Sequence, residues 1–313
     1  MSAQTTSHIL MIRPVNFRMN EQTAVNNYYQ KVLDQLTPER TQEQALKEFD
    51  DFVKNLKTEG VDVIVVQDTT FPDTPDSIFP NNWVSFHEDG RIALYPMFAP
   101  NRRHERRDDI IDMLLDDYGF NVSEIVDFTE FEEHEKFLEG TGSIVLDREN
   151  KIAYAALSDR TDLKAFEHFL EEFLYQGVVF KANQNVHGQR LPIYHTNVMM
   201  CVADRYAVVC PTCIDDVEER QHVIATLIQS GKEIIEISEE QKHRFAGNML
   251  QVNTTTGEKR LVMSQSAYDS LTPEQIAKLK NFNPIIRAKI DTIEAFGGGS
   301  ARCMMAEVFL PKN

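Results

Sequence analysis

Short runs in which hydrophobic and polar residues alternate are followed along this chain by stretches with helical periodicity. Residues 82–87 and 91–96 form two such runs around Asp89-Gly90, a dipeptide typical of a tight hairpin turn. Residues 105–118 place apolar side chains on one helical face, and residues 124–128 have the pattern of a further strand. The pattern therefore predicts a unit made of a β-hairpin, a helix and a third strand.

The same unit recurs along the chain, although its sequence does not visibly repeat. A fifth copy is divided between the two ends, where residues 302–310 are expected to pair with residues 8–13. That copy continues with a helix at 41–59 and a strand at 61–66. The three remaining copies, each given as two hairpin strands, helix and last strand, are 143–146, 152–157, 163–175 and 178–180; 197–202, 206–210, 217–230 and 233–237; and 249–253, 260–264, 273–281 and 284–288.

Five units joined through the chain ends predict an α/β fold in the form of a five-bladed propeller of ββαβ units. Closing a ring of small sheets removes exposed sheet edges, which is the advantage of propeller architectures. No linker or abrupt change of composition divides the chain, so we expect one catalytic domain spanning residues 1–313. An ordinary open α/β sheet stays an alternative, although the antiparallel hairpins inside each unit do not favour it.

Polar residues stand at the start of each predicted hairpin, about one unit apart. These residues are Asn82, Glu139, His195, Asn248 and Cys303. If the units are equivalent, an acid, an imidazole, a thiol and two amides converge around one axis. A cysteine needs a lowered pKa or a partner base to act as a nucleophile, and a histidine can carry the proton. We therefore interpret Cys303 as the nucleophile, His195 as the proton carrier and Glu139 as a group that orients the substrate.

Each of these residues also has an ordinary structural interpretation. Cys303 follows the glycine run 297–299 and precedes an apolar stretch, residues 304–310, so it could be a small buried residue at the start of a core strand. His195 lies in a predicted strand, where a histidine is often a core residue bonded to a carbonyl. Glu139 ends the acidic run 130–139, but the glycines that follow it indicate close approach of the backbone.

Composition excludes several classes of function. The formal net charge of −17 disfavours binding to nucleic acid, which requires clustered Lys and Arg. No apolar run approaches the ~20 residues of a membrane helix, and no basic region followed by an apolar stretch opens the chain, so we expect a cytoplasmic protein that does not bind membranes. The four cysteines are too few for a disulfide framework, and the C-x-x-C at 210–213 lacks a second ligand pair for zinc, so we interpret it as structural. We expect neither a metal nor a cofactor.

Motifs spread over nearly the whole chain resemble those of the amidinotransferase and arginine deiminase superfamily, the penteins. The similarity is greatest to bacterial members described as citrulline-utilisation hydrolases. The motifs are FPNNW at 79–83, APNRR at 99–103, LEGTG at 138–142, LSDRT at 157–161, HTN at 195–197, GN at 247–248 and GGSARC at 298–303.

The resemblance implies the five-bladed propeller and a covalent mechanism. Cys303 would attack the central carbon of a guanidino or ureido group, and His195 would protonate the leaving amine and then activate water or an acceptor amine. Glu139 would bind the substrate nitrogens. Arg102 and Arg160 would hold the substrate carboxylate, a role for which a guanidinium is chemically suited, although each could equally form a surface salt bridge.

Two departures from the deiminase pattern bear on the substrate. Asn82 and Asn197 stand where deiminases usually have aspartates. Carboxylates suit a guanidinium, whereas an amide both donates and accepts and can face the carbonyl of a ureido group. We therefore expect a small amino-acid substrate, citrulline, converted to ornithine, ammonia and carbon dioxide.

Other activities stay open at this point. They are hydrolysis or dihydrolysis of arginine or a substituted arginine, deimination, amidino transfer to an acceptor amine, and a propeller that binds ligands without catalysis. A homodimer is compatible with the sequence but does not follow from it.

Overall fold

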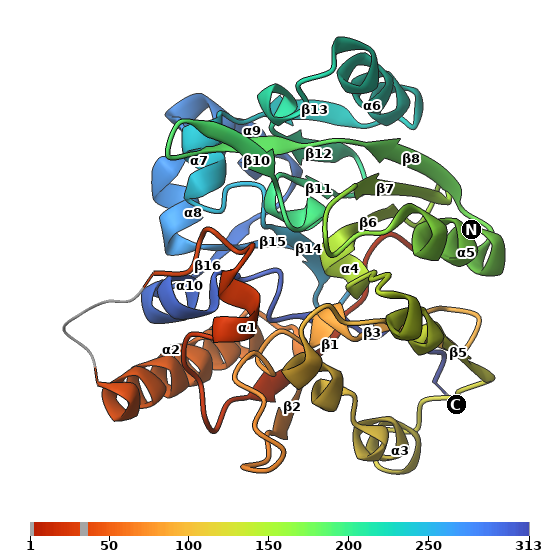
Figure 1. Ribbon diagram of the computed structural model, residues 1–313, viewed down its shortest axis with the longest axis vertical. Coiled ribbons are helices and arrows are strands. Elements are labelled where there is room, and N and C mark those ends of the chain that lie inside the picture. The colour runs from red at the N-terminus through yellow and green to blue at the C-terminus, as the bar shows by residue number, and fades with distance from the viewer. Residues whose placement is uncertain (1–2, 32–36, 313) are drawn as a thin grey trace.

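A computed structural model of the chain describes residues 3–31 and 37–312. Within those residues five three-stranded sheets make up most of the α/β fold (Figure 1). In each sheet the middle strand pairs antiparallel with one neighbour and parallel with the other. The strands, sheet by sheet, are β3 (Val84–Phe86), β4 (Arg91–Leu94) and β5 (Glu124–Asp127); β6 (Ile144–Asp147), β7 (Ile152–Ala156) and β8 (Gln176–Phe180); β11 (Met200–Val202), β12 (Tyr206–Val209) and β13 (Glu233–Glu236); β14 (Leu250–Asn253), β15 (Lys259–Ser264) and β16 (Ile285–Ala288); and β17 (Ala306–Glu307), β1 (His8–Arg13) and β2 (Asp62–Gln67).

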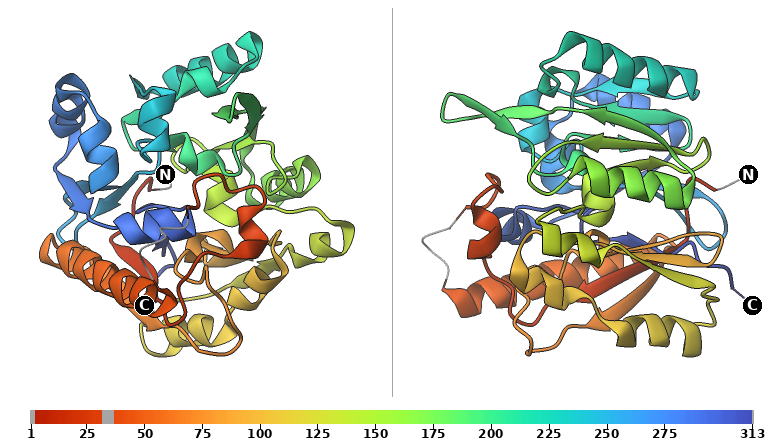
Figure 2. Two further views of the ribbon diagram at one scale, coloured as in Figure 1. Left: turned by 60° about the vertical axis from the view of Figure 1, so that its left-hand side comes forward. Right: turned by 45° about the vertical axis from the view of Figure 1, so that its right-hand side comes forward.

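Helices connect the second and third strands of the sheets, as the hydrophobic pattern predicted. In the left view of Figure 2 they lie at the periphery of the molecule in chain order. They are α2 (Pro38–Thr58), α3 (Asp108–Asp116), α5 (Leu163–Phe173), α6 (Val217–Gln229) and the pair α8 (Gln265–Ser270) and α9 (Pro273–Phe282). Shorter helices are α1 (Glu21–Ala24), α4 (Gly140–Ser143), α7 (Glu239–His243) and α10 (Asp291–Gly297), and a separate hairpin consists of β9 (Asn183–Val186) and β10 (Gln189–Pro192).

Helix α5 illustrates how the sequence specifies these elements. Asp162 caps it by accepting hydrogen bonds from the backbone N–H groups of Lys164 and Ala165. Phe166, Phe169 and other apolar residues on one face are fully buried against the sheet β6–β7–β8. Burying each phenylalanine contributes about 2 kcal/mol, so this face, rather than helix propensity, anchors the helix.

The sheet that unites the two chain ends is confirmed, with a shorter C-terminal strand than expected. Ile9 pairs with Glu307, but β17 contains only two residues instead of the predicted strand over 302–310. Residues 301–304 form a turn that follows the glycine run, so Cys303 lies in a turn and not at the start of a strand.

Two further predictions of strand placement are wrong for the same reason. Asn82 lies in a 3₁₀ turn, η1 (Pro80–Asn82), and His195 directly precedes another, η4 (Thr196–Val198). Each turn leads into the first strand of its sheet, and a turn aims its side chains inward where a strand would alternate them. The helix expected at 105–118 begins at Asp108, because the preceding residues form the 3₁₀ segment η2 (Pro100–Glu105). The other 3₁₀ segments are η3 (Thr129–His134) and η5 (Pro211–Cys213).

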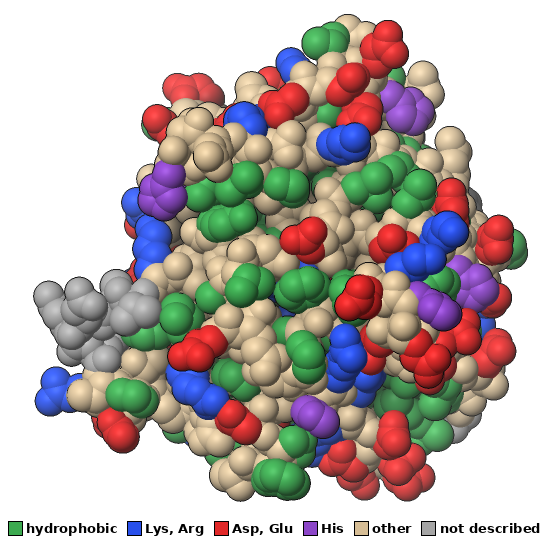
Figure 3. Space-filling model, viewed as in Figure 1, with side chains coloured by type: hydrophobic (Ala, Val, Ile, Leu, Met, Phe, Trp, Pro, Cys, Tyr) green, Lys and Arg blue, Asp and Glu red, His purple; other side chains and the backbone are tan. Residues whose placement is uncertain are grey.

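The surface is polar and acidic. Acidic side chains gather on the face shown in Figure 3, near β5 and α3 at the lower right. No helix among the described residues is long and apolar enough to cross a lipid bilayer.

Candidate active site

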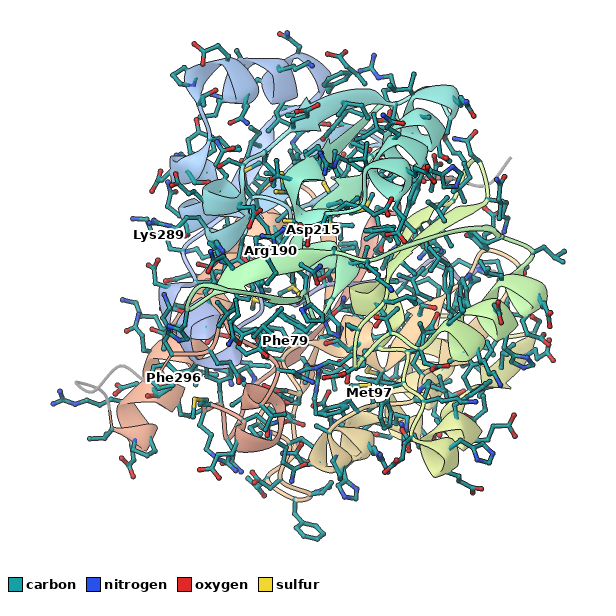
Figure 4. All side chains as sticks on the ribbon, turned by 45° about the horizontal axis from the view of Figure 1, so that its top comes forward. Phe79, Met97, Arg190, Asp215, Lys289 and Phe296 are labelled. Atoms are coloured by element: carbon teal, nitrogen blue, oxygen red, sulfur yellow. The ribbon has the colours of Figure 1, made fainter. Side chains whose placement is uncertain are left out.

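A cavity with about 250 Å³ of empty space lies where the turns before the first strands converge. Phe79, labelled near the middle of the molecule in Figure 4, forms part of its floor beneath the glycine run. The segment around α1 lies on the opposite side of the molecule from both chain ends in the right view of Figure 2, and its Asn27 also reaches the cavity. The lining residues are Asn27, Asp76, Phe79, Asn82, Arg102, Arg160, Tyr194, His195, Gly297, Gly298, Gly299 and Cys303.

Two asparagine amides hold the sulfur of Cys303. Asn248 Nδ2 donates to Sγ at 3.3 Å and Asn197 Nδ2 at 3.6 Å. Asn248 is itself fixed, because its Oδ1 accepts a hydrogen bond from the backbone N–H of Arg302 at 3.0 Å. Cys303 is only 3% exposed, so these donors replace water around the sulfur. N–H donors favour the negatively charged thiolate over the thiol.

His195 and Glu139 form a buried hydrogen-bonded pair. Glu139 Oε2 lies 2.7 Å from His195 Nε2, and its Oε1 accepts from the backbone N–H of Phe98 at 3.0 Å. Burial lowers the pKa of His195 to about 4, although Glu139 acts in the opposite direction. Burial would raise the pKa of Glu139, but Arg160, His195 and Arg102 outweigh it and hold the carboxyl ionised well below its ordinary range.

These protonation states define what the imidazole can do. A neutral ring beside an ionised carboxylate carries its proton on Nε2, where it donates to Glu139. The lone pair then resides on Nδ1, which is free to accept a proton. Glu139 thus fixes the tautomer and orientation of His195 in the same way that a buried carboxylate orients the base in hydrolytic triads.

Gly142 allows His195 and Asn82 to approach one another. A Cβ atom at this position would lie 2.4 Å from Asn82 Nδ2 and 2.8 Å from His195 Nδ1. Both distances are far inside van der Waals contact, so this position in α4 requires a residue with no side chain. The glycine noted in the sequence therefore serves close packing of two polar side chains.

Arg102 determines how the amide of Asn82 is oriented. Its Nη1 donates to Asn82 Oδ1 at 3.0 Å, so the oxygen faces the arginine and Nδ2 is turned away. Nδ2 is buried and has no hydrogen-bond partner among the described residues. The Nε and Nη2 atoms of Arg102 both donate to Glu105 at 2.9 Å. Because Glu105 occupies the guanidinium fork, Arg102 has less capacity for a substrate carboxylate than the sequence suggested.

Arg160 is the second predicted arginine of the cavity, and it is held from the α1 side. Its Nε donates to Asn26 Oδ1 and its Nη2 to the carbonyl of Thr23, both at 2.9 Å. Its guanidinium lies over the ring of Tyr194, 5.1 Å from the centroid. Nη1 lies 3.5 Å from Glu139 Oε2 and keeps donor capacity on the cavity side.

Asp76 is a cavity residue that the sequence analysis missed. Its Oδ2 accepts hydrogen bonds from Asn20 and Thr23, whereas its Oδ1 is buried without a partner among the described residues. The signal available in the sequence was an acid three residues before Phe79, inside an otherwise apolar and proline-rich stretch. An unpartnered carboxylate oxygen facing a cavity is a site for a cation or an N–H donor.

The predicted residues are thus brought together. Asn82, Arg102, Arg160, His195 and Cys303 line one cavity, while Glu139, Asn197 and Asn248 contact its lining from behind. Within the described ranges, no group of three or more His, Cys, Asp or Glu side chains is arranged to hold a metal ion.

Comparison with known proteins supports this arrangement. Residues 13–310 match the sequence family described as N,N dimethylarginine dimethylhydrolase, eukaryotic. No curated protein matches the chain significantly.

Several solved structures share the fold. The N-terminal domain of ArgZ, a cyanobacterial arginine dihydrolase whose cysteine variant was crystallised with substrate, is 18% identical with a TM-score of 0.70 over 97% of this chain and 99% of that domain. AgrE in complex with L-arginine is 16% identical with a TM-score of 0.71, over 98% of this chain but only 40% of AgrE. A dimethylarginine dimethylaminohydrolase bearing an S-methyl-L-thiocitrulline adduct is 16% identical with a TM-score of 0.63, over 97% of this chain and 99% of that one.

Proposed function

Because the chain belongs to the N,N dimethylarginine dimethylhydrolase family of the pentein superfamily and is a hydrolase of non-peptide carbon–nitrogen bonds, we propose that it hydrolyses citrulline through a covalent intermediate on Cys303. The products are ornithine, ammonia and carbon dioxide. The relatives named above act on or bind arginine and its derivatives, so the family supports an arginine-related substrate, and the cavity supports the ureido group in particular.

The observation that carries this choice is the orientation of Asn82. Its oxygen is committed to Arg102, and only the Nδ2 amino group is left to face a substrate. An N–H donor complements the carbonyl oxygen of a ureido group. It opposes a guanidinium, which has N–H groups and no acceptor. The unpartnered donor therefore favours citrulline over arginine.

The other end of an amino acid has matching partners in the same cavity. Asp76 Oδ1 is available to accept from an α-ammonium group, and Arg160 Nη1 to donate to an α-carboxylate. Because both groups are buried and charged, leaving either unpaired is costly, and this favours a zwitterionic ligand.

The reaction follows from the placement of the thiol and the imidazole. The Cys303 thiol gives its proton to His195 Nδ1, and the sulfur attacks the ureido carbon. The imidazolium, stabilised by Glu139, returns the proton to the departing nitrogen, which leaves as an amine. Water then enters, gives a proton to His195 and displaces the sulfur, and the resulting carbamate loses carbon dioxide. One water is consumed for each citrulline.

A substrate panel tests the proposal. Citrulline, arginine, agmatine and dimethylarginine are each incubated with the protein in the absence of an acceptor amine, and ammonia, amino-acid products and a mass adduct on Cys303 are measured. We expect kcat/KM for citrulline to exceed that for arginine by at least about tenfold, the value of one poorly matched hydrogen bond. Arginine turnover equal to or faster than citrulline turnover would refute the choice of substrate. Product that forms only with an added amine would indicate amidino transfer.

The Asn82→Asp variant tests the observation itself. Replacing the amino group by a carboxylate oxygen removes the donor and adds an acceptor, so the ratio of citrulline to arginine turnover should fall by about 100-fold or more. Asn81→Asp is the matched control, because Asn81 is equally buried and adjacent but is outside the cavity lining. A similar change of ratio in both variants would show that added charge, and not the Asn82 amide, sets the preference.

We also propose that the five sheets close into the five-bladed propeller expected from the sequence. Each successive pair of sheets is in contact. β17 lies against β3 and β6 against β11. The other three contacts are hydrogen bonds from Thr141 to the Asn81 carbonyl (3.3 Å), from Gln251 to Asp204 (2.8 Å) and from the Asn253 backbone to Thr6 (2.9 Å). The cytoplasmic location and the homodimer stay predictions.

A further inference from the structure

The C-x-x-C motif at 210–213 brings two thiols into contact outside the proposed active site. Cys210 follows strand β12, and Cys213 ends the 3₁₀ turn η5 that comes next. Their sulfurs lie 3.3 Å apart, and neither cysteine is in a disulfide. Both are fully buried, yet Thr212 between them is exposed, so the sulfurs lie directly beneath the surface.

The surroundings of this pair are polar, unlike those of an ordinary core cysteine. Lys242, fully buried, donates from Nζ to Gln184 Oε1 at 2.9 Å, and its ammonium group lies over the ring of Tyr29. Gln184 Nε2 and Tyr29 Oη are buried without partners among the described residues. A buried ammonium beside two thiols favours a thiolate, which would supply the negative charge that Lys242 otherwise lacks.

The thiol proton is shared between the two sulfurs. The Cys213 S–H donates to Cys210, and this hydrogen bond lowers the pKa of Cys210 to about 7, with a contribution from Lys242. Cys201 provides the contrast, because burial without such partners raises its pKa to about 12. One thiolate and one thiol in contact are the two reactants that disulfide formation requires.

We propose that Cys210 and Cys213 form a redox-active dithiol, a modification site at which a small hydroperoxide produces a reversible disulfide. The Cys210 thiolate attacks the distal peroxide oxygen; the O–O bond breaks, and sulfenic acid forms as the alcohol or water leaves. The Cys213 sulfur then attacks the sulfenic sulfur, the S–O bond breaks, and the thiol proton leaves with the oxygen as water. Two thiols are oxidised by two electrons, the peroxide is reduced, and an external thiol reverses the change.

Peptide mapping of the wild-type protein tests this site. Trypsin cleaves after Arg205, Arg220 and Arg302, so Cys210 and Cys213 stay in one peptide while Cys201 and Cys303 fall in others. The folded protein is treated with hydrogen peroxide, denatured, alkylated and digested. We expect the peptide 206–220 to lose about 2 Da and to resist alkylation at both cysteines together, with full reversal by dithiothreitol.

Two variants sharpen the result. Cys213→Ser removes the resolving thiol, so sulfenic acid on Cys210 should accumulate and react with dimedone. Cys201→Ser is the matched control and should leave the disulfide unchanged. The proposal fails if both thiols stay open to alkylation at a peroxide dose that oxidises Cys303, or if they oxidise separately to sulfinic acids without loss of 2 Da. Because the wild-type map is decisive alone, a variant that does not fold cannot rescue the idea.

Discussion

Gly142→Ala is the smallest substitution that tests the geometry of the proposed site. The new methyl group would lie 2.4 Å from Asn82 Nδ2 and 2.8 Å from His195 Nδ1, where ordinary contact is about 3.5 Å. One or both side chains must therefore move by about 1 Å, a displacement that costs about 100-fold in rate when it affects groups aligned on a substrate. That loss corresponds to about 2.7 kcal/mol of transition-state stabilisation. Because Gly142 has no positive φ, alanine adds no backbone strain.

The assay is kcat/KM for citrulline from ammonia release, with the free energy of unfolding measured in parallel. Gly257→Ala is the control, since Gly257 has φ of +85° in a turn and no atoms within 4 Å of an added Cβ. Alanine there should cost about 1 kcal/mol of stability and leave activity unchanged. If Gly142→Ala keeps activity within threefold of the parent, the reasoning that places Asn82 and His195 in the reaction is wrong.

Three further outcomes are expected. Glu139→Gln should lower kcat by about 10³-fold, because the neutral amide no longer fixes the His195 tautomer or stabilises its imidazolium; a fall confined to KM would contradict this role. Asp76→Asn should raise KM for citrulline at least about tenfold with little change in kcat, and should not affect an analogue that lacks the α-amino group. Since the pKa of His195 is about 4 in the fold and about 6.5 when unfolded, its neutral form is favoured by folding. Stability should therefore be complete above about pH 6.5 and fall toward pH 4, with about 2 kcal/mol lost at pH 5; His195→Gln should lack this component in urea titrations.

The repeated unit was readable from the sequence because its signals are local. Alternation marks the hairpin strands, Asp89-Gly90 marks a turn, and the helices carry an apolar face that any partner surface would bury. The spacing of polar residues by one unit also predicted correctly that Glu139 meets His195 and that Asn248 meets Cys303. The turns at Asn82 and His195 were mistaken for strands, because a three-residue 3₁₀ segment has no periodicity of its own to detect.

The sequence by itself determined which chemical groups converge, since equivalent positions of a repeated unit must lie at equivalent places. Only the tertiary structure decided how those groups are oriented and occupied. Glu105 occupies the fork of Arg102, Arg102 turns the Asn82 amide, and Asp76 keeps one free oxygen. Hydrogen bonds between residues distant in sequence depend on side-chain directions that no local pattern records. The selectivity proposed here, a donor facing a ureido carbonyl, is therefore a property of the fold and not of any single motif.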